Sequence, residues 1–134
     1  MIRYVHEPDS VSAEDLRGFF DGWPNPPSPE THLQLLHNSE HVVLAVDDTT
    51  GCVVGFVTAI TDGVLFAYIP LLEVLRSYRG KGIGSELVRR MLEKLGDLYS
   101  VDLVCDPDLQ PFYERNGMTK VAGMTRKRYD RQAG

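Results

Sequence analysis

The stretch VLFAYIPLLEVLRSYRGKGIGSELVRRMLEKL, residues 64–95, passes from an apolar segment through a glycine-rich turn into a charged, helix-like segment. The turn RGKGIG, residues 79–84, holds three glycines and two cations. Glycine is costly there unless the backbone takes unusual dihedral angles or a partner approaches closely. A turn before a helix also presents free N–H groups at the positive end of the helix dipole. The stretch therefore predicts an anion site, most simply for phosphate.

Two common phosphate motifs do not fit this turn. The P-loop needs the spacing G-x-x-x-x-G-K-[ST], which is absent, and a G-x-G-x-x-G pattern that starts at Gly80 places Ser85 at the last glycine. The order of elements also differs from a dinucleotide-binding domain, because hairpins rather than a strand-helix-strand unit precede the turn. A nucleotide-binding fold of either kind is therefore disfavoured.

The segments around the turn predict the remaining elements. Strands are expected at 2–5, 41–47, 52–60, 64–75 and 101–105, with a break in the fourth at Pro70. Helices are expected within 9–20, at 30–38, from 85 to 95, where apolar residues recur at helical spacing, and at 109–117. A last hairpin is expected in 118–130, around Gly123.

These elements predict an α+β fold, an α/β sandwich with a mixed, mostly antiparallel sheet. Six to seven strands and about four flanking helices are expected. The 134 residues have room for one domain with one core, spanning residues 1–134.

Composition narrows the class of protein. Hydrophobic residues make up 43% and charged residues 25%, which is ordinary globular usage, and the net charge of −5 argues against nucleic acid as the main partner. The N-terminus lacks the apolar core of a signal peptide, and no long apolar run follows, so we expect a cytoplasmic protein without membrane contact. Cys52 and Cys105 show no metal-binding spacing and are expected to be reduced core residues, with no metal site.

Two blocks of the sequence resemble the GCN5-related N-acetyltransferase (GNAT) superfamily. Its signature R/Q-x-x-G-x-G/A is matched by Arg79, Gly82 and Gly84, after the strand end LEVLRSY. The downstream block PFYERNGM, residues 111–118, resembles the family's F-Y-x-x-x-G-F. Arg76 stands where many members have proline, and the asparagine usual after the fifth strand is absent from CDPDLQ. The resemblance implies a GNAT-like acyl-CoA N-acyltransferase fold.

The resemblance also implies acetyl-coenzyme A as the cosubstrate. In the family, backbone N–H groups of the glycine turn hold its pyrophosphate, and the preceding splayed strand pairs with the pantetheine arm. The residues given these roles by resemblance are Leu72, Val74, Leu75, Arg79, Gly80, Lys81, Gly82, Ile83, Gly84, Ser85 and Phe112.

Acetyl transfer to an amine needs a neutral nucleophile, a polarised thioester carbonyl and a proton for the departing thiolate. Tyr113 occupies the family's tyrosine position and is expected to be the general acid, the alternative being a buried aromatic with a structural hydrogen bond. Glu73 is the carboxylate inside the apolar strand and is the candidate base, directly or with water in its place. The alternative for Glu73 is a structural pair with Arg76 or another cation.

The acceptor is expected beside the proline-rich segment, residues 22–37. Trp23, Asn25 and Tyr68 are the candidate acceptor-binding residues, although Trp23 could instead cover the core. His32 and His37 are interpreted as helix-face residues rather than ligands. The sequence thus predicts an N-acetyltransferase acting on a primary amine of a small molecule or peptide. The alternative is a non-catalytic coenzyme A binding regulatory module, and a homodimer is left open.

Overall fold

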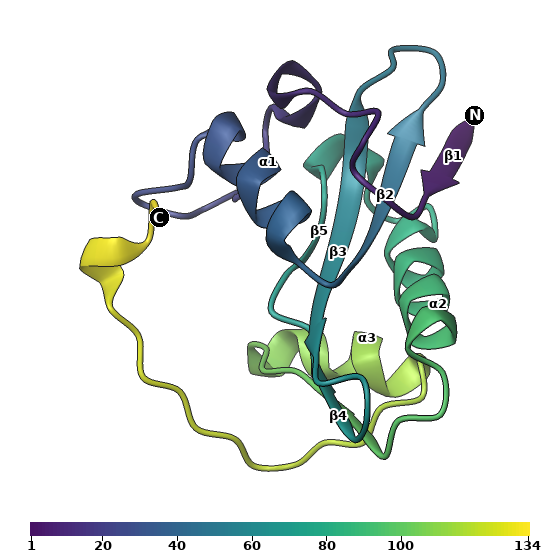
Figure 1. Ribbon diagram of the computed structural model, residues 1–134, viewed down its shortest axis with the longest axis vertical. Coiled ribbons are helices and arrows are strands. Elements are labelled where there is room, and N and C mark those ends of the chain that lie inside the picture. Colours follow the sequence, from purple (N-terminus) through teal and green to yellow (C-terminus); the bar gives the residue numbers. More distant parts are fainter.

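The computed structural model describes residues 1–134 and contains one six-stranded sheet (Figure 1). Its strands lie in the order β1-β2-β3-β4-β6, with β5 also paired to β3, and only the β4–β6 pair is parallel. This arrangement confirms the mixed, mostly antiparallel sheet. The strands are β1 (Ile2–Val5), β2 (His41–Asp47), β3 (Val53–Thr61), β4 (Phe66–Tyr68), β5 (Leu72–Val74) and β6 (Ser100–Asp102).

Three α-helices accompany the sheet: α1 (Pro29–Asn38), α2 (Ile83–Leu95) and α3 (Gln110–Arg115). None of them is long and apolar enough to cross a membrane. The helix expected within 9–20 is only a 3-10 turn, Ala13–Leu16. It stops there because Gly18 and Phe20 have φ values of 91° and 64°, outside the helical region. The fold class is thus confirmed, with three α-helices instead of about four.

The centre of the sheet is buried on both faces. On β2, Val43 and Ala45 belong to the core under α2, while Val42 and Leu44 belong to the core under α1. This follows from the alternation of side chains along a strand. Both faces of β2 are therefore apolar, so α2 packs on one face of the sheet and α1 on the other.

The long apolar strand predicted at 64–75 is divided at Pro70, as expected. Its first part, β4, pairs in parallel with β6 from Phe66 to Tyr68, and its second part, β5, pairs with β3. The last hydrogen bond that joins the two sides runs from Ile69 N–H to the Asp102 carbonyl, at 2.9 Å. Beyond that bond β5 and the chain after β6 separate, and the sheet opens.

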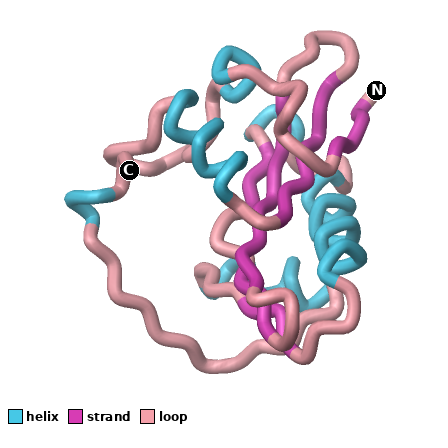
Figure 2. Tube along the Cα trace, viewed as in Figure 1, coloured by secondary structure: helices cyan, strands magenta, loops and turns pink.

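The predicted final hairpin is wrong. Residues 118–128 are extended without a strand partner, and a 3-10 turn, Tyr129–Arg131, follows (Figure 2). A tight hairpin turn needs positive φ angles, and Gly123 does not have one. The core placement of Cys52 is also wrong: it is free but exposed, because it lies in the turn before β3, while free Cys105 is half-buried.

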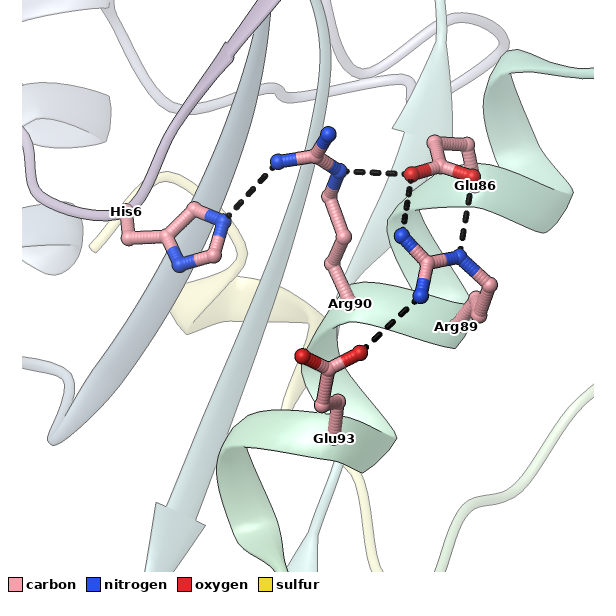
Figure 3. Close-up of polar contacts among 5 residues, drawn as sticks. All are labelled: His6, Glu86, Arg89, Arg90 and Glu93. Atoms are coloured by element: carbon pink, nitrogen blue, oxygen red, sulfur yellow. Dashed lines mark hydrogen bonds and ion pairs between the residues drawn. The ribbon is translucent and has the colours of Figure 1, made fainter.

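The outer face of α2 carries a network of ion pairs that reaches the N-terminal segment (Figure 3). Glu86 accepts from Arg89 and Arg90, at 2.7 and 2.6 Å. Arg90 also lies 3.3 Å from Nε2 of His6 and stacks on the ring of Tyr4. Burial and nearby cations lower the pKa of His6, which favours the neutral ring in this contact. The network ties β1 and the residues after it to α2.

Candidate functional site

A cleft of about 580 Å³ opens where the sheet splits. It lies between β5, the glycine turn, the start of α2, and α3. The residues that line it are Leu72, Glu73, Val74, Tyr78, Arg79, Gly80, Gly82, Ile83, Gly84, Ser85, Leu109, Phe112, Tyr113 and Arg115.

The glycine turn presents free backbone donors to the cleft. Gly80 and Gly82 have φ angles of 77° and 83°, which glycine adopts without strain. The first hydrogen bond of α2 runs from Glu86 N–H to the Gly82 carbonyl. The N–H groups at 83–85 therefore have no partner within the helix, and they stand at the positive end of its dipole. An anion fits this position.

One edge of β5 is also free. The Leu75 N–H donates to the Val54 carbonyl at 2.8 Å, and the Leu71 carbonyl accepts from Thr58 at 3.1 Å, so these groups face β3. Alternation along the strand turns the backbone groups of Leu72 and Val74 the other way, toward the cleft. Arg79 Nε already donates to the Val74 carbonyl, at 2.9 Å. The strand edge can bind an extended, amide-bearing ligand.

Gly84 has a packing reason of its own. A Cβ at this position would lie 3.3 Å from Cζ of Phe112, so glycine lets the phenyl ring lie against the first turn of α2. Asn116 Nδ2 donates to the Phe112 carbonyl at 2.8 Å and to Ser85 Oγ at 3.3 Å. These contacts fix α3 against the helix start and close one side of the cleft.

Tyr113 lies in the wall between this cleft and a second cavity of about 530 Å³. Burial raises the pKa of Tyr113 to about 12, and Cys105 adds to the rise. The phenol therefore keeps its proton at neutral pH. The raised pKa also makes this phenol a weaker acid than an exposed tyrosine.

Glu73 lines the cleft, and both oxygens of its carboxylate accept hydrogen bonds from the backbone at residues 20–21. Oε1 accepts from Phe20 N–H at 2.7 Å, and Oε2 accepts from Asp21 N–H at 3.1 Å. Phe20 is the one non-glycine residue with a positive φ, so these bonds hold a strained segment on β5. Arg76 does not pair with Glu73: its guanidinium binds Asp21, at 2.8 Å.

The structure brings most of the predicted residues into one cleft. Leu75 and Lys81 are the exceptions among the cofactor candidates, because the Leu75 N–H is bonded to β3 and the Lys81 ammonium lies over the ring of Tyr78. Sequence reasoning missed Tyr78, Leu109 and Arg115. Arg115 could have been found, because it lies three residues after Phe112 on the same helix face.

The candidate acceptor residues lie outside the cleft. Trp23 packs on Phe20, with ring centroids 4.9 Å apart, and remains 37% exposed. The Asn25 N–H donates to the side chain of Gln132, at 3.0 Å. Tyr68 lines the second cavity, on the other side of Tyr113. No group of three or more His, Cys, Asp or Glu side chains is placed to hold a metal ion.

Comparison with known proteins decides the family. The model of the acetyltransferase (GNAT) family matches residues 9–118. The chain belongs to the GNAT acetyltransferase family. This match confirms the family resemblance seen in the two sequence blocks, and it covers most of the chain.

Solved structures agree with this GNAT assignment. A Deinococcus radiodurans R1 protein assigned as an acetyltransferase is 51% identical, with TM-score 0.97, covering 99% of this chain and 92% of that one. A GNAT-family protein of Streptococcus pneumoniae TIGR4 is 29% identical, with TM-score 0.77, covering 96% and 98%. The aminoglycoside N-acetyltransferase AAC(6')-Iy, solved in complex with CoA, shares the fold at 14% identity and TM-score 0.69, covering 96% and 94%. A search of curated proteins by sequence gives no match.

Proposed function

We propose that this GNAT protein transfers an acetyl group from acetyl-CoA to a primary amine of a small molecule or peptide. The observation that carries the proposal is the cleft, in which a free strand edge faces the unbonded N–H groups of a helix start. One element suits an amide-bearing arm and the other suits a pyrophosphate. The residues present therefore fit coenzyme A.

The chain's own groups divide the binding work. The N–H groups at 83–85 hold the pyrophosphate, with Arg79 and Lys81 adding positive charge beside the turn. The Val74 N–H and the Leu72 carbonyl pair with the pantetheine amides, because the Val74 carbonyl already accepts from Arg79. The donor we assign to the thioester carbonyl oxygen is the Leu72 N–H, which lies farther from the glycine turn, because the Leu75 N–H is held by β3.

Two side chains move protons in the proposed reaction. The amine nitrogen attacks the thioester carbon, the C–S bond breaks, and the Tyr113 hydroxyl gives its proton to the departing thiolate. The attacking amine is neutral, and the proton that its nitrogen must lose after the attack passes to Glu73, directly or through water. Each carboxylate oxygen accepts only one backbone N–H, so lone pairs remain for this proton.

The acceptor side is assigned to Trp23, Asn25 and Tyr68. Trp23 and Asn25 follow the segment that Glu73 anchors, and Tyr68 shares a cavity with Tyr113. A partly exposed indole and a phenol suit the alkyl or cationic part of an amine. Trp23→Ala is therefore expected to raise KM for the amine while KM for acetyl-CoA stays nearly unchanged.

The test of coenzyme A binding makes the same substitution at two glycines with similar backbone geometry, one in the glycine turn and one in the turn between β2 and β3. Gly82 and Gly51 have φ angles of 83° and 75°, and a Cβ at either meets no atom within 4 Å. Gly82→Asp puts a carboxylate beside the anion site and is expected to weaken acetyl-CoA binding by at least about 100-fold in calorimetry. Gly51→Asp, in the turn between β2 and β3, is the control. Equal affinities in the two folded variants would overturn the proposed site.

Catalysis is tested separately, by release of free thiol from acetyl-CoA with a panel of primary amines. Release that depends on the amine supports the transferase. Binding of coenzyme A without thiol release from any amine would instead favour the non-catalytic regulatory module.

A further inference from the structure

One cation of the cleft has no partner within the chain. Arg79 and Arg115 are the two basic residues that line the cleft. The Arg79 guanidinium donates to the Val74 carbonyl at 2.9 Å and lies 3.5 Å from the Asp21 carboxylate. Arg115 is the last residue of α3, is exposed, and forms no side-chain hydrogen bond, ion pair or cation–π contact. Its charge is therefore free to meet a ligand.

Contacts between α2 and α3 give the place of Arg115 along the cleft. A Cβ at Gly84 would lie 3.3 Å from Phe112 of α3 and 3.8 Å from a side chain of β5, so the first turn of α2 meets both walls there. One helical turn farther along α3, Asn116 donates to Ser85 Oγ at 3.3 Å. Arg115 directly precedes Asn116. Its side chain therefore lines the cleft at the start of α2, beyond the contact with β5.

The proposed binding mode of acetyl-CoA determines which group of the ligand reaches this point. The pantetheine follows the edge of β5, and the pyrophosphate lies at the N–H groups of residues 83–85. The next group along coenzyme A is a ribose that carries a 3′-phosphate. A ligand that runs from β5 to the start of α2 therefore brings its 3′-phosphate past the first turn of α2, to the side on which Arg115 lies.

The 3′-phosphate needs a cation of its own. A phosphate monoester carries a charge of about −1.5 to −2 at neutral pH. The pyrophosphate already has the free N–H groups, the helix dipole and Arg79, whereas the 3′-phosphate has none of these. A planar guanidinium can bind a phosphate through two parallel hydrogen bonds. Because the whole chain has a net charge of −5, attraction at this end of the ligand depends on local cations.

A structural role explains Arg115 less well. A cation in the last turn of a helix offsets the negative end of the helix dipole, but α3 has only six residues. The position of α3 is already fixed by Asn116, which donates to the Phe112 carbonyl at 2.8 Å as well as to Ser85. Neither role requires an unpaired guanidinium on the wall of the cleft.

We propose that Arg115 binds the 3′-phosphate of coenzyme A and makes this site select acyl-CoA over acyl carriers that lack the phosphate. Such carriers include acyl-3′-dephospho-CoA and acyl groups on a phosphopantetheine arm. The inference rests on the proposed function, because it assumes that acetyl-CoA occupies the cleft, and it adds which acyl donors the cleft accepts. Arg115 acts on donor selection and takes no part in the transfer step.

The test compares acetyl-CoA with acetyl-3′-dephospho-CoA by calorimetry. Wild type is expected to bind acetyl-CoA at least about tenfold more tightly. Arg115→Gln should lose most of this preference, while its affinity for acetyl-3′-dephospho-CoA stays within about twofold of wild type. Arg115→Lys keeps the charge without the planar fork and should keep part of the preference. Arg17→Gln is the control, because Arg17 is exposed, unpaired and outside the cleft.

Two results would overturn the assignment of Arg115. One is a wild-type protein that binds both ligands equally. The other is an Arg115→Gln protein that loses the same factor of affinity for both, which would place Arg115 at the pyrophosphate or give it a structural role.

Failure of the proposed function looks different. If wild type binds neither ligand, the coenzyme A site itself is wrong, and the assignment of Arg115 falls with it. If wild type binds both ligands equally and Gly82→Asp weakens both, the coenzyme A site stands and only the role of Arg115 is overturned. Urea denaturation of Arg115→Gln should match wild type, because the side chain is exposed and has no partner in the chain.

Discussion

The two halves of the sheet are built in opposite ways. In the half formed by β1, β2 and β3, the central strands are covered by α2 on one face and by α1 on the other, and every strand pairs antiparallel with its neighbour. In the half formed by β4, β5 and β6, the strands are three residues long, they diverge after Ile69, and their outer edge is unpaired.

The first half, called the closed half below, supplies most of the buried core that stabilises the fold. The second, called the open half, presents the backbone groups that can bind a ligand. Backbone donors that are free to bind a ligand cannot also be satisfied within the chain. They persist at a fixed place only because neighbouring elements are rigid. α2 joins the two roles, since its apolar face packs on the closed half while its N-terminus opens into the cleft.

The largest predicted effect is on the free energy of unfolding, when a Leu→Ala substitution in the closed half is compared with one in the open half. Leu87 on α2 is fully buried, whereas Leu109 is 47% exposed beside the cleft. Leu87→Ala is expected to lower the free energy of unfolding by about 2–5 kcal/mol, because it leaves a cavity in the core. Leu109→Ala is expected to lower it by less than about 1 kcal/mol. Urea denaturation measures both.

Ligand binding should give the opposite order. Leu109→Ala removes part of the cleft wall and is expected to weaken coenzyme A binding about 3- to 10-fold. The folded Leu87→Ala protein should bind nearly as well as wild type. Similar stability losses in the two variants would contradict the division between a closed and an open half.

The second prediction concerns chemistry in the open half. Tyr113→Phe removes the proton donor but keeps the ring, so kcat is expected to fall about 10- to 1000-fold with little change in acetyl-CoA affinity. Tyr99→Phe, at a position 78% exposed to solvent, is the control for loss of a phenol. Steady-state turnover that is equal in the Tyr113→Phe and wild-type proteins would leave Tyr113 with a structural role only.

The third prediction concerns a buried polar group in the closed half. The ring of His32 is 1% exposed, lies 4.4 Å from that of Phe56, and neither ring nitrogen has a hydrogen-bond partner. Burial lowers the pKa of His32 from 6.5 to about 4. The unfolded chain therefore takes up a proton near pH 6.5 that the folded protein refuses until about pH 4, so His32 destabilises the fold as the pH falls through this range.

Comparison with His32→Leu isolates this effect. Between pH 7.5 and 4.5, wild type is expected to lose up to about 3 kcal/mol more stability than His32→Leu, measured by urea denaturation. His37→Leu, at an exposed position on the same helix, controls for loss of a histidine. The same loss of stability in wild type and His32→Leu would show that His32 is not held neutral.

Much of the closed half could be predicted from the sequence, because its signals are local. The β-branched runs of β2 and β3 and the apolar spacing of α2 follow from short-range rules, as does the break at Pro70 in the open half, and the structure has all of them. The glycine turn was also predicted from the local sequence, and in the structure Gly82 has a positive φ, which glycine adopts without strain.

The failures depend on contacts between distant segments. Nothing near Glu73 in sequence indicates that its carboxylate binds the backbone at residues 20–21, and nothing near His32 indicates that three phenylalanine rings surround it. Residues 118–130 have the composition of a hairpin, but a hairpin forms only if its two halves pair with each other. Here residues 119–127 find no partner within the chain.

The smallest predicted effect lies on the outer surface of α2, where polar groups are satisfied but not buried. Hydrogen bonds from Arg89 and then Arg90 lower the pKa of Glu86 from 4.5 to about 2. The stabilisation by this carboxylate is therefore present above about pH 4.5 and is lost as the pH falls toward 2. Because Arg89 is 56% exposed, Glu86→Gln should lower the free energy of unfolding by less than about 1 kcal/mol at pH 7. The difference from wild type should shrink in 1 M salt and vanish near pH 2. A loss of about 3 kcal/mol that is unaffected by salt would instead make these ion pairs (Figure 3) part of what holds the closed half together.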